Sequence, residues 1–145
     1  MRHPVWLRSG GADGMSRLFG RVHIGVTGKP VYGDLLGPRR SAVAVPVICD
    51  NGGGTAAGQL ASAYAVFREQ GSRLSPIGMV TAQYRPRDVH ITLVSGLRMQ
   101  PGTLTVREYW YRPRDGDCCP SGRAIARWTY DGRRLVPRDA LAVHS

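Results

Sequence analysis

The chain has three cysteines, which are its most obvious candidates for covalent chemistry. Cys118 and Cys119 are adjacent in a turn, and Cys49 lies just before an Asn-Gly-Gly-Gly-Thr loop. A nucleophilic thiol needs a base and an orienting group, and no local signature of this kind surrounds any of the three. A zinc site would need a further ligand and a spacing such as Cys-x-x-Cys, which the sequence lacks. We therefore interpret the thiols as structural and predict no metal site.

The spacing of the cysteines favours a bridge between two distant loops. A trans peptide holds the α-carbons of Cys118 and Cys119 about 3.8 Å apart, below the usual disulfide range of roughly 4.4 to 6.8 Å. We expect Cys49 to pair with Cys119 or Cys118, and the sequence leaves open which of the two. Such a bridge would join two strand ends and stabilise the fold by on the order of 4 kcal/mol in the chain-entropy model.

Glu108 is the acidic residue with the most unusual predicted environment. It shares the parity of Leu104 and Val106 in a predicted strand, so its side chain should point toward the apolar side. A buried carboxylate needs a partner or a raised pKa. We expect an ion pair with Arg127 or Arg123, because one lone carboxylate makes no catalytic mechanism.

The glycine-rich loop that follows Cys49 could bind an anion through its backbone amides. Asn51 and Thr55 are its polar candidates for facing a ligand. A flexible turn that lets Cys49 reach its partner is the interpretation we favour.

Residues 107–114 interleave arginine with aromatic residues, as surfaces that bind single-stranded nucleic acids do. Alternation along a strand sends Arg107, Tyr109 and Tyr111 to one face, where they could meet a ligand. An outward pair of tyrosines is also ordinary on a half-exposed sheet.

The elements that must position these residues are β-strands, because apolar and polar residues alternate between turn residues. Strands are expected over residues 21–26, 42–48, 58–69, 74–80, 88–95, 103–112, 124–130 and 133–136. The predicted fold is all-β, an antiparallel meander of about seven strands arranged as a sandwich or partly open barrel. We expect a single domain over 21–138, with a flexible tail at 1–20 and a second tail at 139–145.

Three local features refine this prediction. The alanines of segment 56–69 favour helix, whereas its aromatic and β-branched residues favour strand, and we choose strand. Pro46 lacks an amide proton, which predicts an edge strand or a bulge. Asp131-Gly132 predicts a hairpin with a type I′ turn, which needs positive φ at both central residues.

The formal net charge of +10 and the pI near 10.5 point toward an acidic partner. The arginines are scattered along the chain, which favours their role as solvated surface residues over a dedicated polyanion site. An acidic envelope polymer is the partner considered first, and nucleic acid is the less favoured one. No apolar run approaches the roughly 20 residues that a transmembrane helix needs, and residues 1–10 do not have the apolar stretch of a signal peptide.

A set of motifs carries a resemblance. The set consists of Tyr32-Gly33-Asp34, Ala44 to Thr55, Glu108 to Tyr111, and Cys118 to Arg123. In this combination, residues 28–136 resemble a poorly characterised group of secreted or lipid-anchored actinobacterial β domains. The resemblance implies an extracellular or cell-envelope location, an oxidised cysteine pair and no established enzymatic activity. An acidic loop is typical of similar domains after Tyr-Gly-Asp, but Arg39 and Arg40 stand there instead and would repel calcium.

The sequence therefore predicts a non-enzymatic, secreted or envelope-associated domain of unknown ligand that is held together by a disulfide and uses no cofactor. The alternative is a basic, barrel-like module that binds nucleic acid or another polyanion.

Overall fold

A computed structural model describes residues 11–16, 20–51, 59–87, 91–116 and 118–143. These residues form ten strands, and no helix occurs among them. The strands are β1 (Gly11–Ser16), β2 (Gly20–Val26), β3 (Val31–Gly33), β4 (Ala42–Asp50), β5 (Gln59–Gln70), β6 (Arg73–Val80), β7 (Thr92–Gln100), β8 (Thr103–Trp110), β9 (Gly122–Tyr130) and β10 (Leu135–Ala142).

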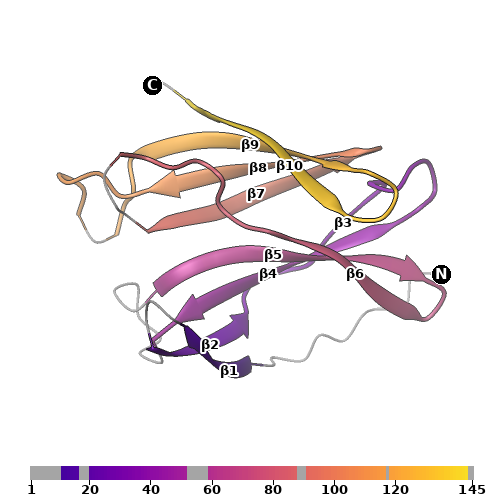
Figure 1. The fold of residues 1–145 in the computed structure, drawn as a ribbon, viewed down its shortest axis with the longest axis horizontal. Helices are drawn as coiled ribbons and strands as arrows, with labels where there is room; N and C mark the ends of the chain where they lie inside the picture. The colour runs from indigo at the N-terminus through magenta and orange to yellow at the C-terminus, as the bar shows by residue number, and fades with distance from the viewer. Residues whose placement is uncertain (1–10, 17–19, 52–58, 88–90, 117, 144–145) are drawn as a thin grey trace.

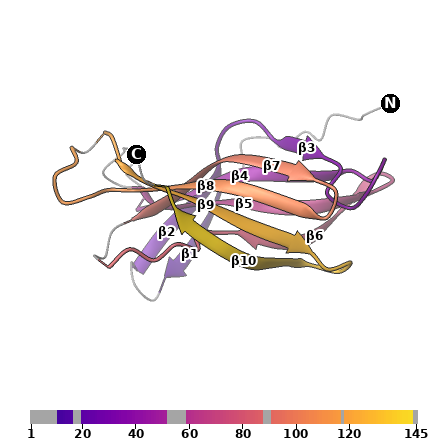
Figure 2. The ribbon, with the colours of Figure 1, turned by 90° about the horizontal axis from the view of Figure 1, so that it is seen from above.

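The strands form two antiparallel sheets that face each other as a sandwich (Figure 1). One sheet has the order β1-β2-β4-β5-β6, with β3 also paired to β4, and the other has the order β10-β9-β8-β7. Seen from above, the four-stranded sheet lies over β4 and β5 (Figure 2). The predicted all-β antiparallel sandwich is confirmed. The described part of the chain holds no helix of the length and apolar character that crossing a membrane requires.

Side chains from the two inner faces build the core. Strands β8 and β9 supply it by strict alternation, since every second residue from Leu104 to Trp110 and from Gly122 to Trp128 is buried. The other sheet contributes from β4, β5 and β6, and Leu35 adds a fully buried side chain from the β3–β4 loop. Ser62 links the two layers, because its hydroxyl accepts a hydrogen bond from the Val94 amide at 2.8 Å.

The ambiguous segment 56–69 is a strand, as predicted, from Gln59 onward, and residues 56–58 lie outside the described part. β5 is twelve residues long, and its inner residues Tyr64 and Val66 are buried against the core. Packing of one apolar face thus outweighs the helical propensity of the alanines. The strand expected over 88–95 instead starts at Thr92 and extends to Gln100, and residues 88–90 lie outside the described part.

Three segments outside the predicted strands also form strands. Residues 11–16 form β1, which pairs with β2, although the prediction assigned them to a tail. β10 continues to Ala142, past the strand end expected at residue 136. Short strand β3 was missed because three residues carry too little alternation to be recognised.

The prediction for Pro46 was wrong. β4 is an interior strand of its sheet, and its register with β5 is regular at Pro46. The Pro46 carbonyl accepts a hydrogen bond from Thr27 in the β2–β3 connection, so the ring nitrogen faces that same side. The proline therefore costs no hydrogen bond to β5, where it pairs with Tyr64.

The β9–β10 hairpin forms where predicted but with a different turn. Tyr130 pairs with Leu135, which leaves four residues in the loop. Gly132 has a φ of 96°, whereas Asp131 has no positive φ, so the turn is not type I′. Instead, the Asp131 carboxylate accepts hydrogen bonds from the backbone amides of Arg133 and Arg134. These charge-assisted bonds lower the Asp131 pKa.

Candidate anion-binding face

The predicted disulfide between Cys49 and Cys119 or Cys118 was wrong. Cys118 and Cys119 are bonded to each other across a Cα–Cα distance of 3.8 Å, and Cys49 is free. A bridge between neighbours closes no long loop, so it adds none of the loop-closure stabilisation expected for a staple between distant segments.

Strand register explains why Cys49 lies apart from the pair. Cys49 is opposite Ala61, and directly opposed residues share one face of a sheet. Its neighbour Ile48 is opposite Ser62, which bonds to the facing sheet, so Ile48 lies on the inner face and Cys49 on the outer one. Pro120, next to Cys119, lines a groove with Ile48 on the inner side. Partial burial, followed by the nearby Asp50 charge, raises the Cys49 pKa.

Glu108 is fully buried, as its parity predicted, but its partners are not arginines. Its two carboxylate oxygens accept hydrogen bonds from the backbone amides of Gln83 and Tyr84 in the β6–β7 connection. Arg127 instead pairs with Asp139, and the Arg123 guanidinium lies over the Tyr109 ring. The sequence could not reveal this arrangement, because a backbone amide at residue 83 or 84 leaves no signal in residue type. Glu108 thus anchors a connection between the two sheets.

Of the glycine-rich loop, the structure describes only the first residue, Asn51. Asn51 is exposed directly after β4, while Thr55 lies outside the described residues. The proposal that this loop faces a ligand stays a prediction.

Arg107 and Tyr109 lie on the outer face of β8, opposite in direction to the buried Trp110. Tyr109 is half-buried, because the Arg123 guanidinium carbon lies 4.5 Å from its ring centroid. Tyr111 follows the end of β8 and is also half-buried. The three residues predicted to face a ligand therefore do not form one exposed aromatic platform.

Register brings arginines from all four strands of the smaller sheet onto its outer face. Arg98 on β7 is opposite Thr105 on β8, which is opposite Arg127 on β9. Arg107 lies two residues after Thr105 on β8 and therefore projects from the same outer face. We call this surface the arginine face, and it consists of Arg98, Arg107, Arg123, Arg127 and Arg138. Each of these residues is exposed. Scattered positions in the sequence thus become one basic surface, which only the strand register could reveal.

The arginine face is only partly neutralised. Arg127 donates to the Asp139 carboxylate at 2.9 Å, with both side chains about half exposed. Exposed pairs of this kind contribute little to stability. Arg123 donates to the carbonyls of Pro120 and Gly122, and the Arg138 Nε donates to the Thr129 hydroxyl at 2.7 Å. These contacts to neutral groups fix the side chains and leave their positive charge uncompensated.

A bulge shapes the middle of the face. β7 changes register between Ser95 and Arg98, and Gly96 has a φ of 63°. A Cβ at Gly96 would lie 3.2 Å from the Arg107 Nε, so the glycine gives the arginine room to lie across the strand.

Comparisons with protein-family models, curated proteins and solved structures return no match to this chain. The resemblance to secreted actinobacterial domains stays a prediction.

Proposed function

We propose that the chain is a non-enzymatic binding module that attaches to an acidic polymer of the cell envelope through the arginine face. The observation that carries this proposal is the gathering of exposed arginines from β7, β8, β9 and β10 on one side of the sandwich. Among the described residues of these strands, register places one acidic side chain, that of Asp139, on the same side.

The shape of the surface favours a polymer over a small molecule. Neighbouring strands lie about 4.8 Å apart, so the arginines form a shallow array and not a closed pocket. An extended polyanion can contact several such cations at once and release bound counterions, which gives binding that weakens as salt rises.

The chemistry of Tyr109 favours a charged polymer over nucleic acid. Single-stranded nucleic acids gain affinity by stacking bases on open aromatic rings. The guanidinium of Arg123 already covers one face of the Tyr109 ring. Recognition through charge alone suits an acidic polysaccharide or polyphosphate better than a base-stacking ligand.

Two observations support a non-enzymatic role outside the cytoplasm. The Glu108 side chain is fully buried, and both of its carboxylate oxygens accept hydrogen bonds from backbone amides. A substrate therefore cannot reach this carboxylate. The bonded pair of Cys118 and Cys119 is compatible with an oxidising compartment, where disulfides persist.

Binding should be measured against polygalacturonate, polyphosphate and poly(dT) over a series of salt concentrations. The triple variant Arg98→Gln, Arg107→Gln and Arg127→Gln should weaken polymer binding at least about tenfold and reduce its salt dependence. The matched control removes the same charge elsewhere, through Arg39→Gln, Arg73→Gln and Arg87→Gln, which are all exposed and outside the face.

Equal weakening in the two triple variants would refute the arginine face as the binding surface, because only net charge would then matter. Binding to poly(dT) that is much tighter than to either acidic polymer would favour the nucleic-acid alternative.

A further inference from the structure

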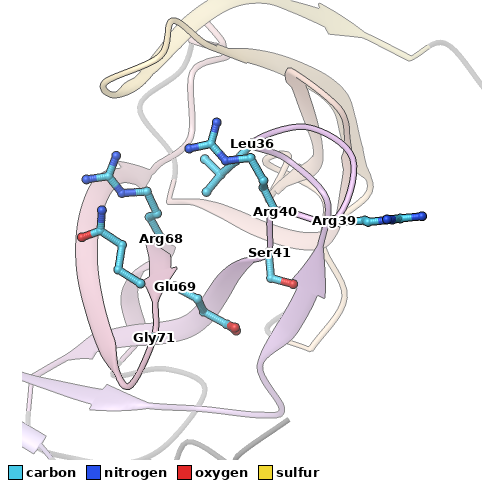
Figure 3. A pocket seen from close by; sticks show the side chains of 8 residues that line it. Leu36, Arg39, Arg40, Ser41, Arg68, Glu69 and Gly71 are labelled. Carbon is cyan, nitrogen blue, oxygen red and sulfur yellow. The ribbon is translucent and has the colours of Figure 1, made fainter. Parts of the chain in front are cut away.

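A second basic site lies at the end of the sandwich where the β3–β4 loop meets the β5–β6 turn. A cavity of about 290 Å³ opens between these segments (Figure 3). Its walls are formed by Leu36, Arg39, Arg40, Ser41, Arg68, Glu69, Gln70 and Gly71. This volume is near the lower limit of about 300 Å³ for small-molecule sites, so the cavity suits a small ligand.

The side chains of Arg40 and Arg68 extend toward the same side of this cavity. In Figure 3 the guanidinium group of Arg40 lies beside Leu36 and that of Arg68 extends in the same upward direction at the left, whereas Arg39 points away to the right. The side-chain oxygens of Glu69 and Ser41 are directed to the opposite side. Both guanidinium groups are therefore directed away from the Glu69 carboxylate.

Strand alternation explains this separation of charge. Arg68 is opposite Ala42, a core residue, so Arg68 lies on the inner face of β5. Glu69 follows it and must project from the other face. Its backbone amide bonds to the Ser41 carbonyl at 3.3 Å and holds the β3–β4 loop against the end of β5.

The Arg68 guanidinium has an unmet hydrogen bond. Its Nε is buried and has no hydrogen-bond partner within the described part of the chain. A buried donor of a charged group is costly to leave unpaired, and an anion beside the guanidinium would compensate its positive charge.

The β3–β4 loop presents Arg40 through two successive turns. Gly37 donates to the Asp34 carbonyl and Arg40 donates to the Gly37 carbonyl, each at 3.1 Å. Between them Arg39 has a φ of 60°, in the left-handed region that is uncommon for residues other than glycine. This conformation sends consecutive arginines in different directions, with Arg40 toward the cavity.

We infer that Arg40 and Arg68 form a binding site for a tetrahedral oxyanion, a phosphate or sulfate group, either free or carried on a small ligand. Planar guanidinium groups match the oxygens of such anions with paired hydrogen bonds. The site belongs to the six-stranded sheet and its loops, so it does not depend on the arginine face of the other sheet.

The direct test is NMR of the arginine Nε–Hε signals during titration with inorganic phosphate at constant ionic strength, with chloride as the reference. The Arg68 signal should shift in a saturable way. The variants Arg68→Gln and Arg40→Gln should each weaken phosphate binding by about tenfold, while Arg87→Gln, which removes an exposed arginine that does not line the cavity, should leave it unchanged.

Other outcomes overturn the inference. A linear shift without saturation, or an equal loss of phosphate binding in Arg87→Gln, would show that phosphate binding depends only on the general positive charge of the protein. Arg40 is exposed, so Arg40→Gln should fold normally and keep the test valid if Arg68→Gln does not fold.

One further ligand identifies the source of the anion. Tighter binding of glycerol 3-phosphate than of inorganic phosphate would indicate a phosphate carried on a small ligand, and equal or weaker binding would indicate the free ion. The arginine-face triple variant should bind phosphate as the unmodified protein does, so the two sites can fail separately.

Discussion

The carboxylate of Glu108 accepts a hydrogen bond from the backbone amide of Tyr84 at 2.7 Å, and the Tyr84 ring stacks on Trp110 with centroids 4.7 Å apart. A second amide, that of Gln83, bonds to the other carboxylate oxygen. These contacts hold the β6–β7 connection, which passes from one sheet to the other in Figure 1. One residue on β8 therefore fixes how the two layers are joined.

Replacing Glu108 with Gln should destabilise the protein. The variant keeps one acceptor oxygen but turns an NH₂ donor toward a backbone amide donor, so one buried hydrogen bond is lost. We expect the free energy of unfolding to fall by about 1 to 3 kcal/mol, measured by urea denaturation. Hydrogen exchange at the amides of Gln83 and Tyr84 should become faster.

Glu69→Gln is the matched control, because Glu69 is a half-buried glutamate at the end of β5. It should change stability by no more than about 0.5 kcal/mol. If both variants lose the same stability, or if amide exchange at residues 83 and 84 stays slow in Glu108→Gln, the anchoring role of Glu108 is wrong.

Gly122→Ala should destabilise the sandwich by overpacking. Gly122 is opposite Trp110, and an added Cβ would overlap the indole ring. Overpacking of this kind costs about 1 to 3 kcal/mol, which a shift of the urea midpoint would report. Gly116→Ala serves as the control, because its Cβ would meet open space and its φ is not positive. Equal midpoints for the two variants would contradict the predicted overlap.

The sequence predicted the fold where side-chain alternation decides it. The buried faces of β8 and β9 follow directly from their period of two, and the same rule assigned Glu108 to the interior. The core needs only apolar residues at alternate positions, and this alternation can be recognised in the sequence alone.

The errors concern features that depend on contacts between distant segments. The side of β4 to which the Pro46 nitrogen points, and the face on which Cys49 lies, are set by register with other strands. The arginine face also depends on register, because Arg98 and Arg127 reach the same face through their pairing with Thr105 on the strand between them. Periodicity within one strand carries no information on these pairings.

Thiol labelling should distinguish the two cysteine arrangements. Without reductant, iodoacetamide should modify Cys49 alone, and a peptide containing residues 118 and 119 should retain its disulfide by mass spectrometry. Burial and the Asp50 charge raise the Cys49 pKa, so less thiolate is present at a given pH. The labelling rate should therefore be lower than that of a small model thiol at pH 8.

Two results would contradict this prediction. Isolation of a disulfide-linked peptide that contains residue 49 would restore the bridge expected from the sequence. A labelling rate equal to that of the model thiol would show that the surroundings of Cys49 do not suppress its ionisation.

Acid should loosen the β8–β9 loop through Asp115. Its carboxylate accepts hydrogen bonds from the Arg112 amide at 2.6 Å and from the amide and hydroxyl of Ser121, and these bonds lower its pKa. A lowered folded pKa stabilises the loop above the unfolded value of about 3.9, and this stabilisation is lost as pH falls through the folded pKa. The protection of the Arg112 and Ser121 amides, measured relative to the intrinsic exchange rate at each pH, should therefore fall below about pH 4.

Asp115→Asn should produce the same loosening at neutral pH, because the amide side chain is a weaker acceptor than the carboxylate and does not titrate. Protection of the amides at residues 112 and 121 should then be low at pH 7 and should not decrease further in acid. Asp139→Asn, on β10, should leave both amides unaffected. If Asp115→Asn keeps the acid response, another group causes the pH dependence of the β8–β9 loop. The Asp115 carboxylate would then not be the group that holds this loop together.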